Sequence, residues 1–177
     1  METEKGSVKK VAMQYGLILG LVSIMLAVVV YAMGQTYEQP WWQGALGFVI
    51  MLLCILYAIK AFKAGNSGFL SLGEALKVGL AVALIAGIMG VLFNLFFSTV
   101  IEPDYTMILL DKAQSDMVAQ NPNMTEEQME LSMSITEKMV SPGVLAAIGI
   151  VASLFLGFII SLISGLIMKV EKPAHLE

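Results

Sequence analysis

The chain has 177 residues, of which 58% are hydrophobic and only 14% are charged, and its mean hydropathy is +0.82. A soluble domain averages roughly 45–50% apolar and about 25% charged residues, so this composition excludes a soluble monomer and a disordered chain. The one cysteine excludes an internal disulfide framework and a cysteine-based metal cluster. A net charge of −4 with no arginine argues against a nucleic-acid partner, which would call for a basic patch.

Four long stretches of the chain contain no charged residue, and each exceeds the roughly 20 apolar residues that a helix needs to cross a bilayer. None shows the alternation of period two that a membrane β-barrel requires. We therefore predict an all-α membrane protein with four transmembrane helices in an up-down bundle, forming a single integral-membrane domain over residues 1–177. The expected spans are about 11–34, 42–60, 74–100 and 142–168, with an outer amphipathic helical hairpin at 101–141.

The first span follows three lysines, as a signal peptide would, but its apolar run is longer than the 7–15 residues of a signal sequence. We expect it to be retained. Eight of the ten lysines fall on one side of the predicted topology, and only two lie on the other, in the third connection. Nine of the fourteen acidic residues lie on that second side. Positive charge marks the cytoplasmic side, so both termini are expected there. The eight lysines are Lys5, Lys9, Lys10, Lys60, Lys63, Lys77, Lys169 and Lys172, and the two are Lys112 and Lys138.

Small residues recur every four positions along the fourth span, so on a helix they form one stripe. They are Gly149, Ser153, Gly157, Ser161 and Gly165. The first span has the same spacing at Gly16 and Gly20, and the third has it at Gly79, Ala83 and Gly87. Such stripes let two helix backbones approach closely in lipid. The favoured interpretation is packing within one chain; the alternatives are a homo-oligomer through the fourth span, or a ligand groove lined by Ser153 and Ser161.

The connection between the second and third spans contains Ser71 and Glu74 at the spacing of a capping box. In such a box the serine side chain accepts from the amide three residues on, and the glutamate accepts from the serine amide. The third helix is then expected to begin near Leu72. A functional alternative would make Glu74 a carboxylate that handles protons or ions, because charge near a membrane is costly and often functional.

The only sizeable polar segment separates the third and fourth spans. It predicts two short helices, at 103–119 and 126–139, around the turn Asn121-Pro122-Asn123, with a second capping box at Thr125 and Gln128. In the second helix Met129 and Met133 share one face, and Leu131, Ile135 and Met139 share the adjacent one. We expect this hairpin to lie on the outer membrane surface or to cap the bundle.

Chemistry-bearing patterns are scarce. The pair Met129 and Met133 offers two thioethers, the soft ligands that Cu(I) prefers, but the only histidine, His175, lies in the tail. Methionine also fills contact surfaces, and we favour that interpretation. Asn94 is expected to hydrogen-bond a neighbouring helix, and Cys54 to be an inert buried thiol. No nucleophile, base and metal arrangement is apparent. We therefore expect no catalytic residue, no metal, no cofactor and no enzymatic activity.

One segment is distinctive: Asn66-Ser67-Gly68-Phe69-Leu70-Ser71-Leu72-Gly73-Glu74-Ala75-Leu76-Lys77-Val78-Gly79, followed later by Glu102-Pro103-Asp104 at the start of the polar segment. With the lysine-rich arm and the order of the spans, it resembles an uncharacterised bacterial family of four-span inner-membrane proteins, known as a domain of unknown function. The resemblance covers nearly the whole chain. It implies topology and bacterial origin, and it transfers no activity, ligand or catalytic residue.

The sequence thus leads to a protein with strong packing signals and no visible chemistry. We expect a non-enzymatic structural or interaction component of the bacterial envelope, whose partners are the lipid bilayer and an envelope protein that contacts the outer hairpin. The alternative is a small oligomeric transporter or channel subunit, assembled through the stripe on the fourth span.

Overall fold

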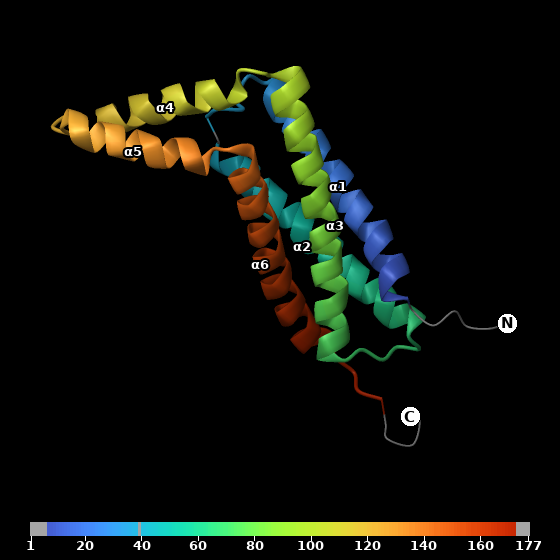
Figure 1. Cartoon of the computed structure of the whole chain (residues 1–177). Coiled ribbons are helices and arrows are strands. Elements are labelled where there is room, and N and C mark those ends of the chain that lie inside the picture. Colours follow the sequence, from blue (N-terminus) through green and yellow to red (C-terminus); the bar gives the residue numbers. More distant parts are fainter. Residues whose placement is uncertain (1–6, 39, 173–177) are drawn as a thin grey trace. The chain divides into compact units, whose positions relative to one another are not determined.

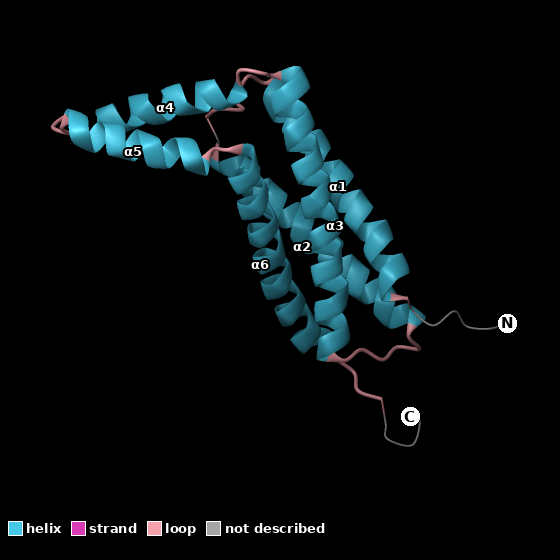
Figure 2. Cartoon of the chain, in the orientation of Figure 1, coloured by secondary structure: helices cyan, strands magenta, loops and turns pink. Residues whose placement is uncertain are grey.

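The computed structural model describes residues 7–38 and 40–172, and these residues form six α-helices and one π-helical turn (Figures 1 and 2). Lys5 and His175 lie outside the described residues. In chain order the elements are α1 (Val8–Ala32), α2 (Trp41–Gly65), α3 (Leu72–Phe96), η1 (Phe97–Ile101), α4 (Tyr105–Gln120), α5 (Glu126–Met139) and α6 (Pro142–Met168).

Four of these helices are long and apolar enough to cross a membrane: α1, α2, α3 with its continuation to Ile101, and α6. The predicted all-α class with four apolar helices is therefore confirmed, and the chain is a multi-pass membrane protein. The α2 helix runs to Gly65, past the predicted end of the second span at residue 60. A helix does not have to stop where the hydrocarbon stops, and lysine side chains at its end can reach toward water.

Local chemistry fixes several helix ends. The Ser7 side chain accepts a hydrogen bond from the Lys10 amide at the start of α1. The α2 helix begins directly after Pro40, whose backbone is extended and which caps the helix without a side-chain hydrogen bond. After α1 the chain turns at Gly34, whose φ of +71° is strained for a residue with a Cβ atom.

The chain divides into two compact units. The first contains the described residues up to Gly90 and from Ile150 onward, and the second contains Val91–Gly149. The core of the first unit is apolar, and its largest fully buried hydrophobic side chains come from α2, α3 and the connection between them. They are Ile55, Ile59, Leu70, Val78 and Val82.

In the first unit α3 contacts the other three spanning helices (Figure 1). Ala75, Gly79, Ala83 and Gly87 of α3 meet Gly165, Ser161, Gly157 and Ser153 of α6, in that order. The numbers rise along one helix and fall along the other, so α3 and α6 are antiparallel. Gly16 and Gly20 of α1 meet Ile85 and Met89, so α1 and α3 are parallel. These directions fit the predicted up-down order.

In the second unit α4 and α5 pack side by side as a helical hairpin (Figure 1). The start of α4 is fixed by aromatic packing, since the rings of Phe97 and Tyr105 meet edge to face with their centroids 5.4 Å apart. The Thr125 side chain accepts from the Gln128 amide, and the Gln128 side chain accepts from the Thr125 amide. Both bonds of the second predicted capping box are therefore present at the start of α5.

Candidate functional site

The small residues of α6 lie against the small residues of α3. A Cβ atom built on Gly157 would lie 2.5 Å from the Ala83 Cβ, and one built on Gly165 would lie 2.8 Å from the Ala75 Cβ. Real Cβ atoms essentially never come so close, so the two backbones could not keep this separation if either glycine carried a side chain. From Ser153 to Gly165 the stripe is occupied by α3 of the same chain.

The hydroxyl groups of the serines in α6 donate hydrogen bonds to backbone carbonyls. Ser153 Oγ donates across the interface to the Ala83 carbonyl at 2.8 Å, and Ser161 Oγ donates within its helix to the Gly157 carbonyl at 2.5 Å. Ser164 Oγ donates to the Ile160 carbonyl at 2.6 Å. Ser161 is fully buried against Gly79, so no open groove runs along this part of the stripe. Only the Ser153 bond joins two helices, and the other two satisfy their hydroxyl groups within α6.

The remaining glycines of the predicted packing set differ in their surroundings. A Cβ atom on Gly16 would lie 2.7 Å from the Ile85 Cβ, and one on Gly20 would overlap the Met89 side chain. Both residues are buried in the contact between α1 and α3. Gly149, the first member of the stripe, is exposed, and a Cβ atom there would meet nothing within 4 Å. The stripe therefore makes its close contacts only from Ser153 onward.

The connection before α3 contains the predicted capping box. The Ser71 amide donates to Glu74 Oε2 at 2.8 Å, and the Glu74 amide donates to Ser71 Oγ at 3.2 Å. The same carboxylate accepts from Ser71 Oγ at 2.9 Å and from Asn66 Nδ2 at 3.4 Å. Glu74 thus holds the start of α3 and the end of α2 together, which accounts for its charge at this position.

Two contacts near this box join segments that are about 100 residues apart, and sequence reasoning missed both. Lys63 Nζ, near the end of α2, donates to the Met168 carbonyl at the end of α6 at 2.8 Å. The backbones of Leu70 and Val170 exchange two hydrogen bonds, at 2.8 and 2.9 Å. No local pattern signals such pairs, because the sequence around each residue does not indicate a partner far away in the chain.

The faces of α5 separate three kinds of side chain. Met129, Met133 and Thr136 are half-buried and share one face. Leu131, Ile135 and Met139 share another and are exposed. The exposed carboxylates Glu126, Glu130 and Glu137 form a third face. The two apolar faces predicted from the sequence thus differ in burial. The face with Met129 and Met133 is half-buried, whereas the face with Leu131, Ile135 and Met139 is exposed.

The methionines of the hairpin do not form one exposed group. Met117, Met124, Met129 and Met133 are half-buried, whereas Met107 and Met139 are exposed. Within residues 7–38 and 40–172, no three His, Cys, Asp or Glu side chains lie together as a metal site would require. The half-buried methionines fit the role of adaptable filler along a helix contact.

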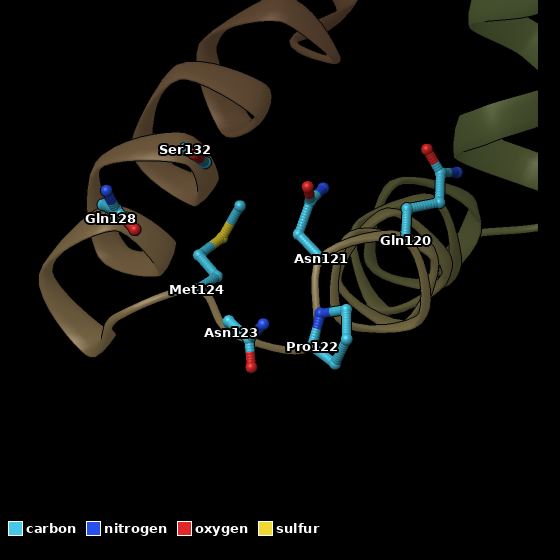
Figure 3. Close-up of a pocket in the computed structure, with 7 residues that line it drawn as sticks. All are labelled: Gln120, Asn121, Pro122, Asn123, Met124, Gln128 and Ser132. Carbon is cyan, nitrogen blue, oxygen red and sulfur yellow. The ribbon is translucent and has the colours of Figure 1, made fainter.

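A pocket of about 590 Å³ lies at the tip of the hairpin, where α4 turns into α5 (Figure 3). Figure 3 shows the Asn121 and Met124 side chains directed toward the space between the two helices. The lining has amide and hydroxyl groups and one thioether but no charged side chain. The lining residues are Gln120, Asn121, Pro122, Asn123, Met124, Gln128 and Ser132.

Four other polar or reactive side chains lie outside the stripe, the capping box and the pocket described above. Asn94 in α3 and Cys54 in α2 are half-buried. Burial raises the pKa of the Tyr105 phenol above its usual value. In the second unit, Thr99 Oγ1, within the π-helical turn, donates to the Leu95 carbonyl at 2.7 Å. Such bonds from threonine to the preceding turn are known to bend helices.

Comparison with known proteins identifies a family. A family model described as "Protein of unknown function (DUF4199)" matches residues 14–170. No curated protein and no solved structure matches the chain. The match covers most of the chain, including α2, α3, α6 and all but the first residues of α1, and confirms the resemblance to a domain of unknown function. The chain belongs to the DUF4199 family.

Proposed function

We propose that this member of the DUF4199 family is a non-enzymatic component of a bacterial inner membrane and acts through its α4–α5 hairpin on another envelope component. The observation that carries the proposal is the contrast between the two units. In the spanning helices, Ser153, Ser161 and Ser164 donate to backbone carbonyls, so their hydroxyl groups are already hydrogen-bonded. The hairpin, in contrast, exposes the carboxylates of α5 and the amide-lined pocket at its tip.

The distribution of lysine supports a cytoplasmic position for the two termini. In an up-down bundle, the start of α1, the end of α2, the start of α3 and the end of α6 lie at one end. Lys9, Lys60, Lys77 and Lys169 belong to these four positions, whereas Lys112 and Lys138 belong to the hairpin. A positive end is typical of the cytoplasmic side. The hairpin would then face the periplasm.

The proposal is tested by photocrosslinking in native membranes. A photoreactive residue is placed at Gln120 or Glu130 of the hairpin, both of which are exposed. We expect each position to give a discrete protein adduct that can be identified by mass spectrometry. The matched control is Val151, which is 65% exposed on α6 and should contact lipid. Lipid adducts alone from both hairpin positions would refute the proposal.

A small oligomeric transporter or channel subunit is the second candidate. The packing of α6 on α3 counts against an oligomer assembled through the fourth span, because the stripe from Ser153 to Gly165 is already occupied within the chain. An oligomer would have to form through another face. A one-copy mass in native nanodiscs, together with no solute flux in proteoliposomes, would reject this candidate. An oligomer with flux would replace the first proposal.

A further inference from the structure

The exposed apolar face of α5 is a regular stripe. Leu131, Ile135 and Met139 are 63%, 51% and 52% exposed, and they follow one another at intervals of four residues. On a helix this spacing places them above one another on one side. In water such a row would be unfavourable, because each side chain leaves apolar surface exposed.

The α4 helix does not cover this stripe. The half-buried residues of α5 are Met129, Ser132, Met133 and Thr136, which lie on a different side of the helix. On α4 itself the exposed apolar residues Met107 and Val118 share their face with Asp111 and Gln114, so α4 has no matching stripe. The row on α5 is the only continuous one among the described residues of the hairpin.

Three carboxylates of α5 lie on the opposite side of the helix. At 100° per residue, Glu126, Glu130 and Glu137 cluster about 160° around the helix from the centre of the apolar stripe, whereas the exposed Glu127 and Lys138 flank the stripe at about 80° and 60° from its centre. A helix with an apolar side and a charged side opposite to it can lie in the plane of a membrane surface. Because the charged side is acidic, attraction to anionic lipid would not contribute, and binding would depend on apolar burial.

The short connection to α6 keeps the end of the apolar stripe close to the start of a spanning helix. Met139 precedes Pro142, the first residue of α6, by three positions. Three residues span at most about 11 Å even when fully extended. The first turns of α6 already carry the exposed apolar residues Val144 and Ile148, which face lipid in a spanning helix. The end of the stripe is therefore tied to the bilayer boundary, whose polar layer is roughly 5–7 Å thick on each side.

We propose that α5 lies along the membrane surface and inserts Leu131, Ile135 and Met139 into the interfacial layer of the bilayer. The occupant of this face is lipid of the leaflet next to the hairpin, contacted through its acyl chains. The carboxylates of Glu126, Glu130 and Glu137 then point away from the membrane. This inference does not depend on a protein partner, although it leaves the acidic face available for one.

The test measures lipid contact at single positions of the full chain in phosphatidylcholine nanodiscs, where both membrane surfaces are accessible. In a Cys54→Ala background, the variants Leu131→Cys, Ile135→Cys and Glu130→Cys are each labelled with an environment-sensitive fluorophore. We expect lipids carrying a nitroxide near the headgroup to quench labels 131 and 135 at least twofold more than label 130. Aqueous iodide should show the reverse order.

Three results would overturn the inference. If iodide quenches all three labels equally, then α5 stands in water. If label 135 is quenched by lipid but label 131 is not, α5 rises away from the surface. If labels 131 and 135 are shielded from both quenchers, protein rather than lipid covers the stripe. Circular dichroism of each labelled variant checks that helix content is unchanged. The lipid results and the photocrosslinking at Gln120 and Glu130 can fail independently.

Discussion

Gly157 and Gly149 belong to the same sequence stripe but have opposite surroundings. Gly157 is buried, and a Cβ atom there would lie 2.5 Å from the Ala83 Cβ. The Ala83 Cβ is attached directly to its backbone, so relief would require the helices to separate. Gly149 has open space around it. The individual residue, rather than the repeat, therefore decides whether a side chain is tolerated.

This difference predicts opposite results for Gly157→Ala and Gly149→Ala. Forcing α3 and α6 apart should cost about 1–3 kcal/mol of stability, as overpacking does in other tightly packed cores. Alanine at Gly149 should leave stability unchanged or raise it by up to about 1 kcal/mol, because alanine favours the helix over glycine. Thermal unfolding midpoints in one detergent measure both. Equal destabilisation by the two variants would contradict the described packing.

At the scale of elements, α3 packs against the other spanning helices. It meets α6 through Ala75, Gly79, Ala83 and Gly87, and it meets α1 through Ile85 and Met89. Its first turn is held by Ser71 and Glu74. The ends of α2 and α6 are joined by Lys63, which donates to a carbonyl that has no partner within its own helix. A charged donor at a helix C-terminus also interacts favourably with the helix dipole.

The contact of Lys63 predicts a specific loss when the ammonium group is removed. Lys63→Met keeps much of the side-chain volume but leaves the Met168 carbonyl without this donor, and should cost about 0.5–2 kcal/mol. Lys60→Met is the matched control, because it removes the same charge from an exposed position one turn earlier. Unfolding midpoints are compared in the same detergent. A loss of similar size in both variants would indicate a general effect of charge.

The elements that could be predicted from the sequence are those whose causes lie within a short stretch of chain. Charge-free runs indicated all four spanning helices, and the spacing of Ser71 with Glu74 and of Thr125 with Gln128 indicated two helix starts. The π-helical turn at Phe97–Ile101 was not predicted. It lies where Ser98 and Thr99 bond back to the Leu95 carbonyl, and serine or threonine in a helix can form such bonds without changing the helix type.

At the scale of the molecule, the sequence predicts that charge is divided between the two sides of the membrane. In the predicted topology eight lysines belong to the side that contains both termini, and nine carboxylates belong to the first and third connections. The membrane therefore separates a basic side from an acidic one in the predicted topology. This partition, more than the net charge of −4, is the basis for orienting the protein.

The orientation predicts which loops a reagent can reach. In a Cys54→Ala background, Gln120→Cys and Ala64→Cys each provide one thiol at an exposed position. A membrane-impermeant maleimide applied to spheroplasts should label position 120 directly and position 64 only after permeabilisation, because Ala64 lies near the lysine-rich end. Gel shift or mass spectrometry measures the labelling. The opposite pattern would show that the protein is inverted.

The sequence by itself determined that the chain is helical, that four segments are apolar enough to span a membrane, and where small residues and helix caps occur. These follow from composition and short spacings, which act within a few turns of one helix. Only the tertiary structure decided which helix fills the stripe on α6, which of its glycines are in contact, and that Lys63 reaches Met168. A small residue permits close approach but does not specify a partner, and such pairings are chosen by contacts between segments far apart in the chain.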